Sequence, residues 1–234
     1  MSLFQPISVV CPFCDETITM EAVGSVNADR RPDLRDAILE NNFQYVPCGS
    51  CGKSFRLQPE FNYLDTGNRL WIAAMPASRM PYYLDVEDDV FDLFDSSYGK
   101  KAPAAAQGVG KELDVRITFG WPAVREKLFA RVNDLDDVVL ELLKLDILRQ
   151  MPTAPLGPGI ELRLIGLLGD QMAFIWVNAQ TEDAIEEFNI PREWYDSIAD
   201  NSEAWAATRA RLEQGPFLDM QKLYMGQGRA AARA

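Results

Sequence analysis

The chain has 234 residues, of which 47% are hydrophobic and 25% are charged, and its formal net charge is -12 at pH 7. A chain of this length and composition can bury enough apolar surface for one large domain or two small ones. A chain that is disordered along its whole length is therefore excluded. The acidic average surface repels phosphate backbones and anionic lipids, so a nucleic-acid partner would need a local basic exception.

The chain contains no histidine. This excludes Ser-His-Asp and Cys-His catalysis as well as histidine-ligated metal sites. The N-terminal residues MSLFQPISVV carry no cationic leader, and no apolar run approaches the roughly 20 residues of a membrane span. We therefore expect a soluble, cytoplasmic protein whose thiols stay reduced.

Short strands and one helix are expected in the first third of the chain. Apolar and polar residues alternate at 17–26, 43–46 and 54–57, which predicts strands. A helix is predicted at 31–40, because Pro32 lies near its first turn and its apolar residues share one face. The runs 61–64 and 70–75 flank Gly67 and Asn68, and this pattern favours a β-hairpin.

An acidic segment runs from Tyr82 to Asp95, with apolar residues between its carboxylates. It is either a partner-binding segment or an amphipathic helix that packs on its own chain and leaves an acidic face in solvent. Its apolar residues, which would be the anchors in the first case, are Val86, Val90, Phe91 and Phe94. A Lys-, Ala- and Gly-rich stretch follows at 100–111, and its composition indicates a linker.

The last part of the chain is predicted to be mainly helical. We expect Pro122 to open a helix that runs to about Arg131, and Asp134 to cap a second, buried helix that runs to about Gln150. A hairpin is predicted for 160–168 and 171–178 around Gly169, followed by helices at 192–200 and 202–212.

Four cysteines form two close pairs, Cys11-Pro-Phe-Cys14 and Cys48-Gly-Ser-Cys51. Tetrahedral zinc needs four ligands, and a two-residue gap lets one tight turn direct two thiolates at the same ion. Gly52 gives backbone freedom just after the second pair, and Asp15 holds the matching position after the first. In a reducing compartment the pattern predicts one structural Zn²⁺ bound by all four cysteines.

Two other interpretations of the cysteines stay open. A redox dithiol normally needs a single reactive pair beside a helix N-terminus, whereas both pairs here have strand and turn surroundings. An iron–sulfur cluster, or no metal, is the other alternative. A shell of four thiolates leaves no open position for water, so a zinc ion at this site would be structural and not catalytic.

The segments CPFC, CGSCG and FNYLDTGNRLWIAAMP resemble the bacterial CpXC family. The segment RITFGWPAVREKLFARVNDLDDVVLELLKLDIL resembles the region that follows the cysteine domain in longer members, so the resemblance spans about 11–148. The second motif departs from the family pattern, because Pro47 precedes its first cysteine where the family has proline after it. The resemblance implies that the four cysteines bind zinc, and it implies no activity.

These patterns predict an α+β protein in four parts. Residues 1–99 form a CpXC-like zinc-ribbon domain of β-hairpins, with a small inserted helix and an acidic C-terminal segment. A linker follows at 100–111. Residues 112–225 form a helix-rich α+β region with one β-hairpin, and 226–234 form a flexible tail. The favoured function is a non-enzymatic, zinc-stabilised scaffold or adaptor. We expect the protein to bind a protein partner or to self-associate, with residues 82–95 as a candidate contact surface. We expect no membrane association and no catalytic residue.

Two alternative functions remain at this point. The first is nucleic-acid binding through the ribbon, for which the chain offers five basic residues near the cysteines: Arg30, Arg31, Arg35, Lys53 and Arg56. The net charge argues against it. The second is an unrecognised enzyme with a site between the two regions, which a deep pocket lined by convergent charged side chains would favour.

Overall fold

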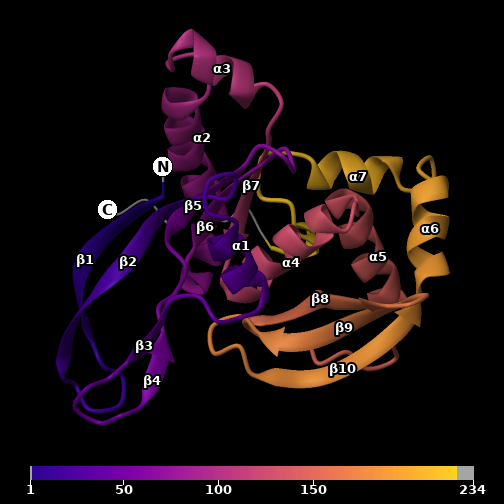
Figure 1. The fold of residues 1–234 in the computed structure, drawn as a ribbon. Helices are drawn as coiled ribbons and strands as arrows, with labels where there is room; N and C mark the ends of the chain where they lie inside the picture. Colours follow the sequence, from indigo (N-terminus) through magenta and orange to yellow (C-terminus); the bar gives the residue numbers. More distant parts are fainter. Residues whose placement is uncertain (1, 226–234) are drawn as a thin grey trace, which may run out of the picture.

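The computed structural model describes residues 2–225, and the predicted tail at 226–234 lies outside this part (Figure 1). Helices and strands are mixed along the chain, which confirms the α+β class. The main sheet has the strand order β1-β2-β5-β6-β7. Its strands are β1 (Leu3–Val10), β2 (Thr17–Asn27), β5 (Phe61–Asp65), β6 (Leu70–Met75) and β7 (Asp114–Phe119).

Two parallel strand pairs in this sheet require crossover connections. β2 pairs in parallel with β5, and the chain between them forms α1 (Pro32–Leu39) and a small hairpin of β3 (Tyr45–Pro47) and β4 (Ser54–Arg56). β6 pairs in parallel with β7. The connection between them forms the 3-10 helix η1 (Ala77–Tyr82), α2 (Tyr83–Ser97) and α3 (Ala104–Gly110).

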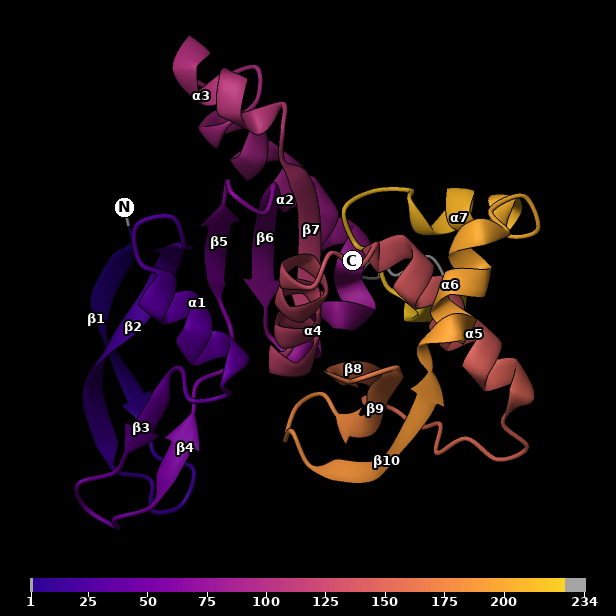
Figure 2. The same ribbon diagram turned by 45° about the vertical axis from the view of Figure 1, so that its right-hand side comes forward.

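Strand β6 is buried on both faces, and its alternating side chains join two separate cores. Leu70, Ile72 and Ala74 pack in the core that includes residues of α1 and α4 (Trp121–Val132). Trp71 and Ala73 pack in the core that includes residues of α2. The centre of the sheet is therefore covered by helices on both sides, as Figure 2 shows.

The C-terminal part packs helices on a second sheet of order β10-β9-β8. Its core contains the apolar side of α5, the inner faces of the strands and residues of the last two helices. The elements are α5 (Asp137–Gln150), β8 (Ile160–Leu168), β9 (Gln171–Asn178), β10 (Ala184–Pro191), α6 (Arg192–Asp200), α7 (Ala206–Leu212) and the 3-10 helix η2 (Met220–Leu223).

A network of buried charges joins α4, α5, β8 and the segment around η2. Lys144 lies between Glu126 (2.6 Å) and Glu141 (3.0 Å), and Arg163 pairs with Glu126 (2.9 Å). Arg163 also binds Asp219 and Glu161, and Lys127 binds Asp137 and Glu141. The predicted buried helix α5 thus buries three charged residues, Asp137, Glu141 and Lys144, together with its leucines.

Four local features differ from the sequence predictions. Asp136, not Asp134, caps α5: its carboxylate accepts hydrogen bonds from the Val138 and Val139 amides. The predicted linker at 100–111 contains α3. The strand that follows it, β7, pairs with β6, so this segment connects two neighbouring strands of the main sheet. The predicted C-terminal hairpin gains a third strand, β10, and the predicted helix at 202–212 begins at Ala206. The division into separate domains stays a prediction.

None of the helices formed by residues 2–225 is both long enough and apolar enough to cross a membrane.

Candidate metal centre

The two cysteine pairs lie in the turns of two hairpins that extend from the body of the protein (Figure 1). Cys11 and Cys14 lie in the connection between β1 and β2, and Cys48 and Cys51 lie in the connection between β3 and β4. We call each of these turns a knuckle. The β1–β2 pairing runs from Leu3 opposite Ser25 to Val10 opposite Thr17, so the first knuckle is held at the end of a long two-stranded arm.

The two knuckles have the same backbone geometry. In the first, the Cys11 amide donates to the Glu16 carbonyl (2.8 Å), and the Asp15 amide donates to the Cys11 carbonyl (3.0 Å). In the second, the Cys48 amide donates to the Lys53 carbonyl (2.9 Å) and the Gly52 amide to the Cys48 carbonyl (2.8 Å). Asp15 has φ 59° and Gly52 has φ 71°, so both adopt the left-handed conformation that the sequence predicts at these positions.

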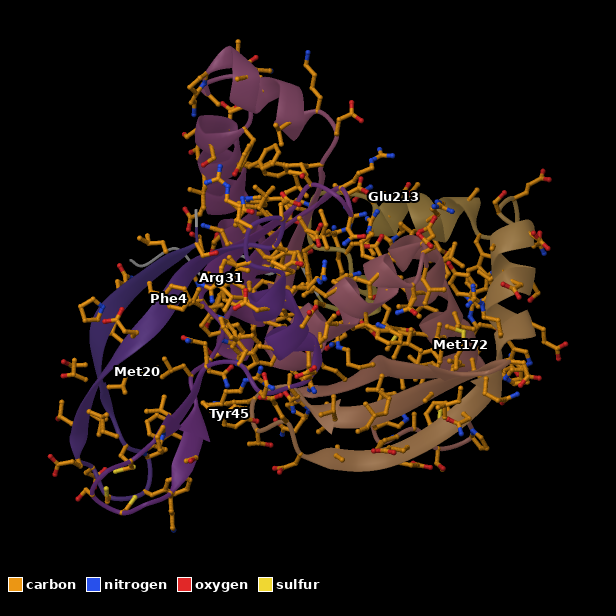
Figure 3. All side chains as sticks on the ribbon, in the orientation of Figure 1. Phe4, Met20, Arg31, Tyr45, Met172 and Glu213 are labelled. Carbon is orange, nitrogen blue, oxygen red and sulfur yellow. The ribbon has the colours of Figure 1, made fainter. Side chains whose placement is uncertain are left out.

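The fold brings together the four thiols that the sequence selects. Their Sγ atoms lie within 4.8 Å of one another, and Figure 3 shows sulfur atoms gathered at this end of the hairpins. The closest pairs each join the two knuckles: Cys11 to Cys51 at 3.8 Å and Cys14 to Cys48 at 3.7 Å. These distances exceed a disulfide bond of about 2.05 Å. They match the separation of about 3.8 Å between thiolates that surround a tetrahedral ion at about 2.3 Å.

The cluster is partly shielded and holds its thiols in different protonation environments. Cys11 and Cys48 are buried, whereas Cys14 is exposed. The Cys51 amide, helped by that of Ser50, donates to Cys48 Sγ and lowers the pKa of this thiol to about 7. The Glu16 amide acts in the same direction on Cys14, but desolvation and the three neighbouring sulfurs outweigh it and raise the Cys14 pKa to about 12. Four thiols at this separation compete to ionise, and a cation among them would remove that conflict.

The donor set itself defines what this centre could hold. Four sulfur ligands in a compact group favour soft or borderline ions, and such a group could bind a metal ion. Because every ligand position of a tetrahedral ion would be filled by cysteine, the centre offers no place for a substrate. One bound ion would also link the β1–β2 and β3–β4 hairpins, which are separate elements of the fold.

Of the five basic residues that the sequence places near the cysteines, three form ion pairs, and Arg31 lies toward the opposite end of the β1–β2 arm from the sulfur atoms (Figure 3). Arg31 pairs with Asp33 at 2.6 Å, and Arg35 pairs with Asp36 at 3.2 Å. Arg56, the last residue of β4, pairs with Glu182 at 2.9 Å. Lys53 lies over the exposed Phe13 ring, 4.8 Å from its centroid. The ion pairs offset the charge of Arg31, Arg35 and Arg56, which weakens the case for a phosphate-binding surface formed by these residues.

The acidic segment forms most of α2 and packs partly on its own chain. Val86 and Val90 are buried in the core on this side of the main sheet. Phe94 makes an edge contact with Trp71, with ring centroids 5.3 Å apart. Of the four apolar residues that the sequence suggests as anchors, only Phe91 is largely exposed, at 51%. Leu93, which the sequence did not single out, is 40% exposed.

Paired cysteine knuckles at the ends of two hairpins, one of them formed by β1 and β2 of the main sheet, are typical of ribbon-type proteins that bind a metal ion. The model of the CpXC protein family matches residues 9–144, which is more than half of the chain. The chain therefore belongs to the CpXC family. The match includes both knuckles, all of the main sheet from β2 onward and α4. A search of curated proteins and a search of solved structures found no match.

Proposed function

We propose that this protein is a non-enzymatic adaptor of the cytoplasm, stabilised by one structural Zn²⁺, that binds another protein or a second copy of itself. The arrangement of the four thiols carries the proposal, because each knuckle supplies two of the four sulfurs. An ion bound by Cys11, Cys14, Cys48 and Cys51 would lock the two hairpins together and leave no position for catalysis. Membership of the CpXC family supports the metal-binding part of this proposal.

Zinc is the favoured ion because four-cysteine sites with two-residue spacing suit tetrahedral geometry and a borderline-soft metal. The ends of the two hairpins bury little apolar surface of their own, since Val10, Phe13 and Tyr45 are all exposed. Such small hairpins need an additional link to hold one conformation. The ion would supply that link.

The outward face of α2 is the proposed contact surface. It carries the exposed carboxylates of Asp88, Asp89 and Asp92, with Phe91 and Leu93 at its two opposite edges, because residues two apart in an α-helix point about 200° apart. Lys101 pairs with Asp92 at 2.9 Å and Arg79 reaches Asp89 at 4.0 Å, but both bridges are exposed and contribute little. An acidic surface with one exposed apolar side chain at each edge suits a partner that offers basic and apolar side chains. As Figure 1 shows, α2 and α3 project from the opposite end of the molecule to the knuckles.

The double substitution Phe91→Ser and Leu93→Ser tests the contact surface. Both side chains are exposed, so the variant should keep the melting temperature of the wild type and lose self-association or partner capture. Sedimentation velocity measures the first and affinity purification from the native host measures the second.

Phe94→Ser is the matched control, because Phe94 lies on the same helix and packs on Trp71. It should lower the melting temperature and leave assembly of the folded protein intact. If the double variant with Phe91→Ser and Leu93→Ser associates and captures partners as the wild type does, this face of α2 is not a contact surface.

A further inference from the structure

Two arginines from distant parts of the chain share one carboxylate. Arg56 Nη1 lies 2.9 Å from Glu182 Oε2, and Arg125 Nη2 lies 3.2 Å from the same oxygen. Arg56 is fixed further, since its Nε donates to the Phe43 carbonyl at 2.8 Å and its guanidinium lies 3.9 Å from the Trp121 ring centroid. The group therefore joins β4, α4 and the turn between β9 and β10.

This group has more positive charge and more hydrogen-bond donors than its partners satisfy. Two guanidinium groups face one carboxylate, and the side chains of Arg56, Arg125 and Glu182 are only 6%, 26% and 15% exposed. Arg56 Nη2 and Arg125 Nε are buried and have no hydrogen-bond partner among the described residues. A buried donor without a partner is costly, as is an uncompensated buried charge, and an anion beside Arg125 would offer this side chain an acceptor and supply the missing negative charge.

The pKa shifts of the two arginines agree with an excess of positive charge. Burial lowers the pKa of both side chains, although Glu182 raises it in each case. The charge on Arg125 lowers the pKa of Arg56 further. One carboxylate thus does not compensate the desolvation of the pair.

A cavity of about 310 Å³ lies beside Arg125, between the end of α1, the first turns of α4 and the β8–β9 pair. Asn41, Arg125 and Glu182 line its polar end. Arg163 also lines it, but Glu126, Glu161 and Asp219 already neutralise that side chain. The remaining lining is apolar: Leu39, Pro122, Phe129, Leu164, Ile165, Ile175 and Val177.

We propose that this cavity binds a small organic monocarboxylate with an aliphatic body. The carboxylate pairs with Arg125 and supplies the negative charge that the Arg56–Arg125–Glu182 group lacks. The aliphatic body contacts Phe129, Ile165 and Ile175. A largely apolar lining favours such a ligand over a hydrated phosphate, whose dianion would lose water contacts without replacing them. This site is separate from the metal centre and does not depend on the adaptor function proposed above.

Titration calorimetry of the full-length protein with acetate, butanoate, hexanoate and octanoate tests the proposal. Affinity should rise by up to about fourfold for each added methylene until the cavity is full. Hexanol, which has the chain without the charge, should bind at least about tenfold more weakly than hexanoate, because the charge-assisted pair with Arg125 is missing.

Arg125→Gln should lower the affinity for hexanoate by at least about tenfold. Its melting temperature without ligand should not fall below that of the wild type, since Arg56 keeps Glu182 and loses a like charge. The matched control is Arg192→Gln on α6, which should bind hexanoate as the wild type does. Three results would overturn the proposal: no acid of the series binds, hexanol binds as tightly as hexanoate, or folded Arg125→Gln keeps the wild-type affinity.

Discussion

Replacing Lys144 with methionine should destabilise the protein by about 3–5 kcal/mol, the cost of removing one partner from a buried ion pair. Lys144 is fully buried between Glu126 (2.6 Å) and Glu141 (3.0 Å). Methionine keeps most of the side-chain volume, so the loss reports on charge and not on a cavity. Glu126 keeps Arg163 and the Leu164 amide, and Glu141 keeps Lys127 and the Met220 amide. These remaining partners place the expected loss near 3 kcal/mol.

Urea unfolding at pH 7, followed by tryptophan fluorescence, measures this loss. The matched control is Lys101→Met: Lys101 pairs with Asp92 at 2.9 Å, but this pair is exposed, so the variant should keep a free energy of unfolding close to that of the wild type. Adding Glu141→Gln to Lys144→Met removes one of the carboxylates left in excess and should restore part of the stability. If Lys144→Met and Lys101→Met lose equal and small free energies of unfolding, the buried network contributes nothing specific and the reasoning fails.

Two further predictions concern acid and the cysteines. Arg163 and Lys144 outweigh the effect of burial on Asp219 and lower its pKa to about 2. The ionised Asp219 should contribute about 2 kcal/mol to the free energy of unfolding above about pH 4, and most of this contribution should be lost as the pH falls to about 2. Urea unfolding midpoints of the wild type and of Asp219→Asn across this pH range measure the contribution. If the midpoints of both proteins fall equally steeply with pH, the assignment to Asp219 is wrong. Cys48→Ser should make both knuckles sensitive to protease and leave α4 and α5 resistant, and Ser50→Ala, at an exposed neighbouring position, is the control. Limited proteolysis with mass spectrometry measures this. Knuckles that stay fully protected without bound metal would contradict the prediction.

Local patterns in the sequence predict the cysteine cluster well. The two-residue spacing, with a residue tolerant of positive φ after each pair, specifies two similar turns, and the structure has both. Turn chemistry around Gly67 likewise predicts the β5–β6 hairpin, and proline and leucine placement predict α1. In each case the physical cause lies within about ten residues of chain.

Features that depend on distant contacts were not predictable in this way. β10 has the sequence AIEEFNIP, with acidic residues and a terminal proline, and it is a strand because it pairs with β9. The same holds for β7, which follows a helix in the predicted linker and joins the main sheet beside β6. Arg56 and Glu182 meet across the fold although no local pattern relates them. The contact depends on how β4, α4 and the second sheet pack together.

Metal analysis of the purified full-length protein tests the central claim most directly. X-ray absorption spectroscopy combined with elemental analysis should find about one zinc per chain, bound by four sulfur atoms at about 2.3 Å. That result would fit the four Sγ atoms gathered by the two knuckles. A fully folded protein that contains no metal and has four reactive thiols would contradict the claim that a zinc ion holds the two hairpins together.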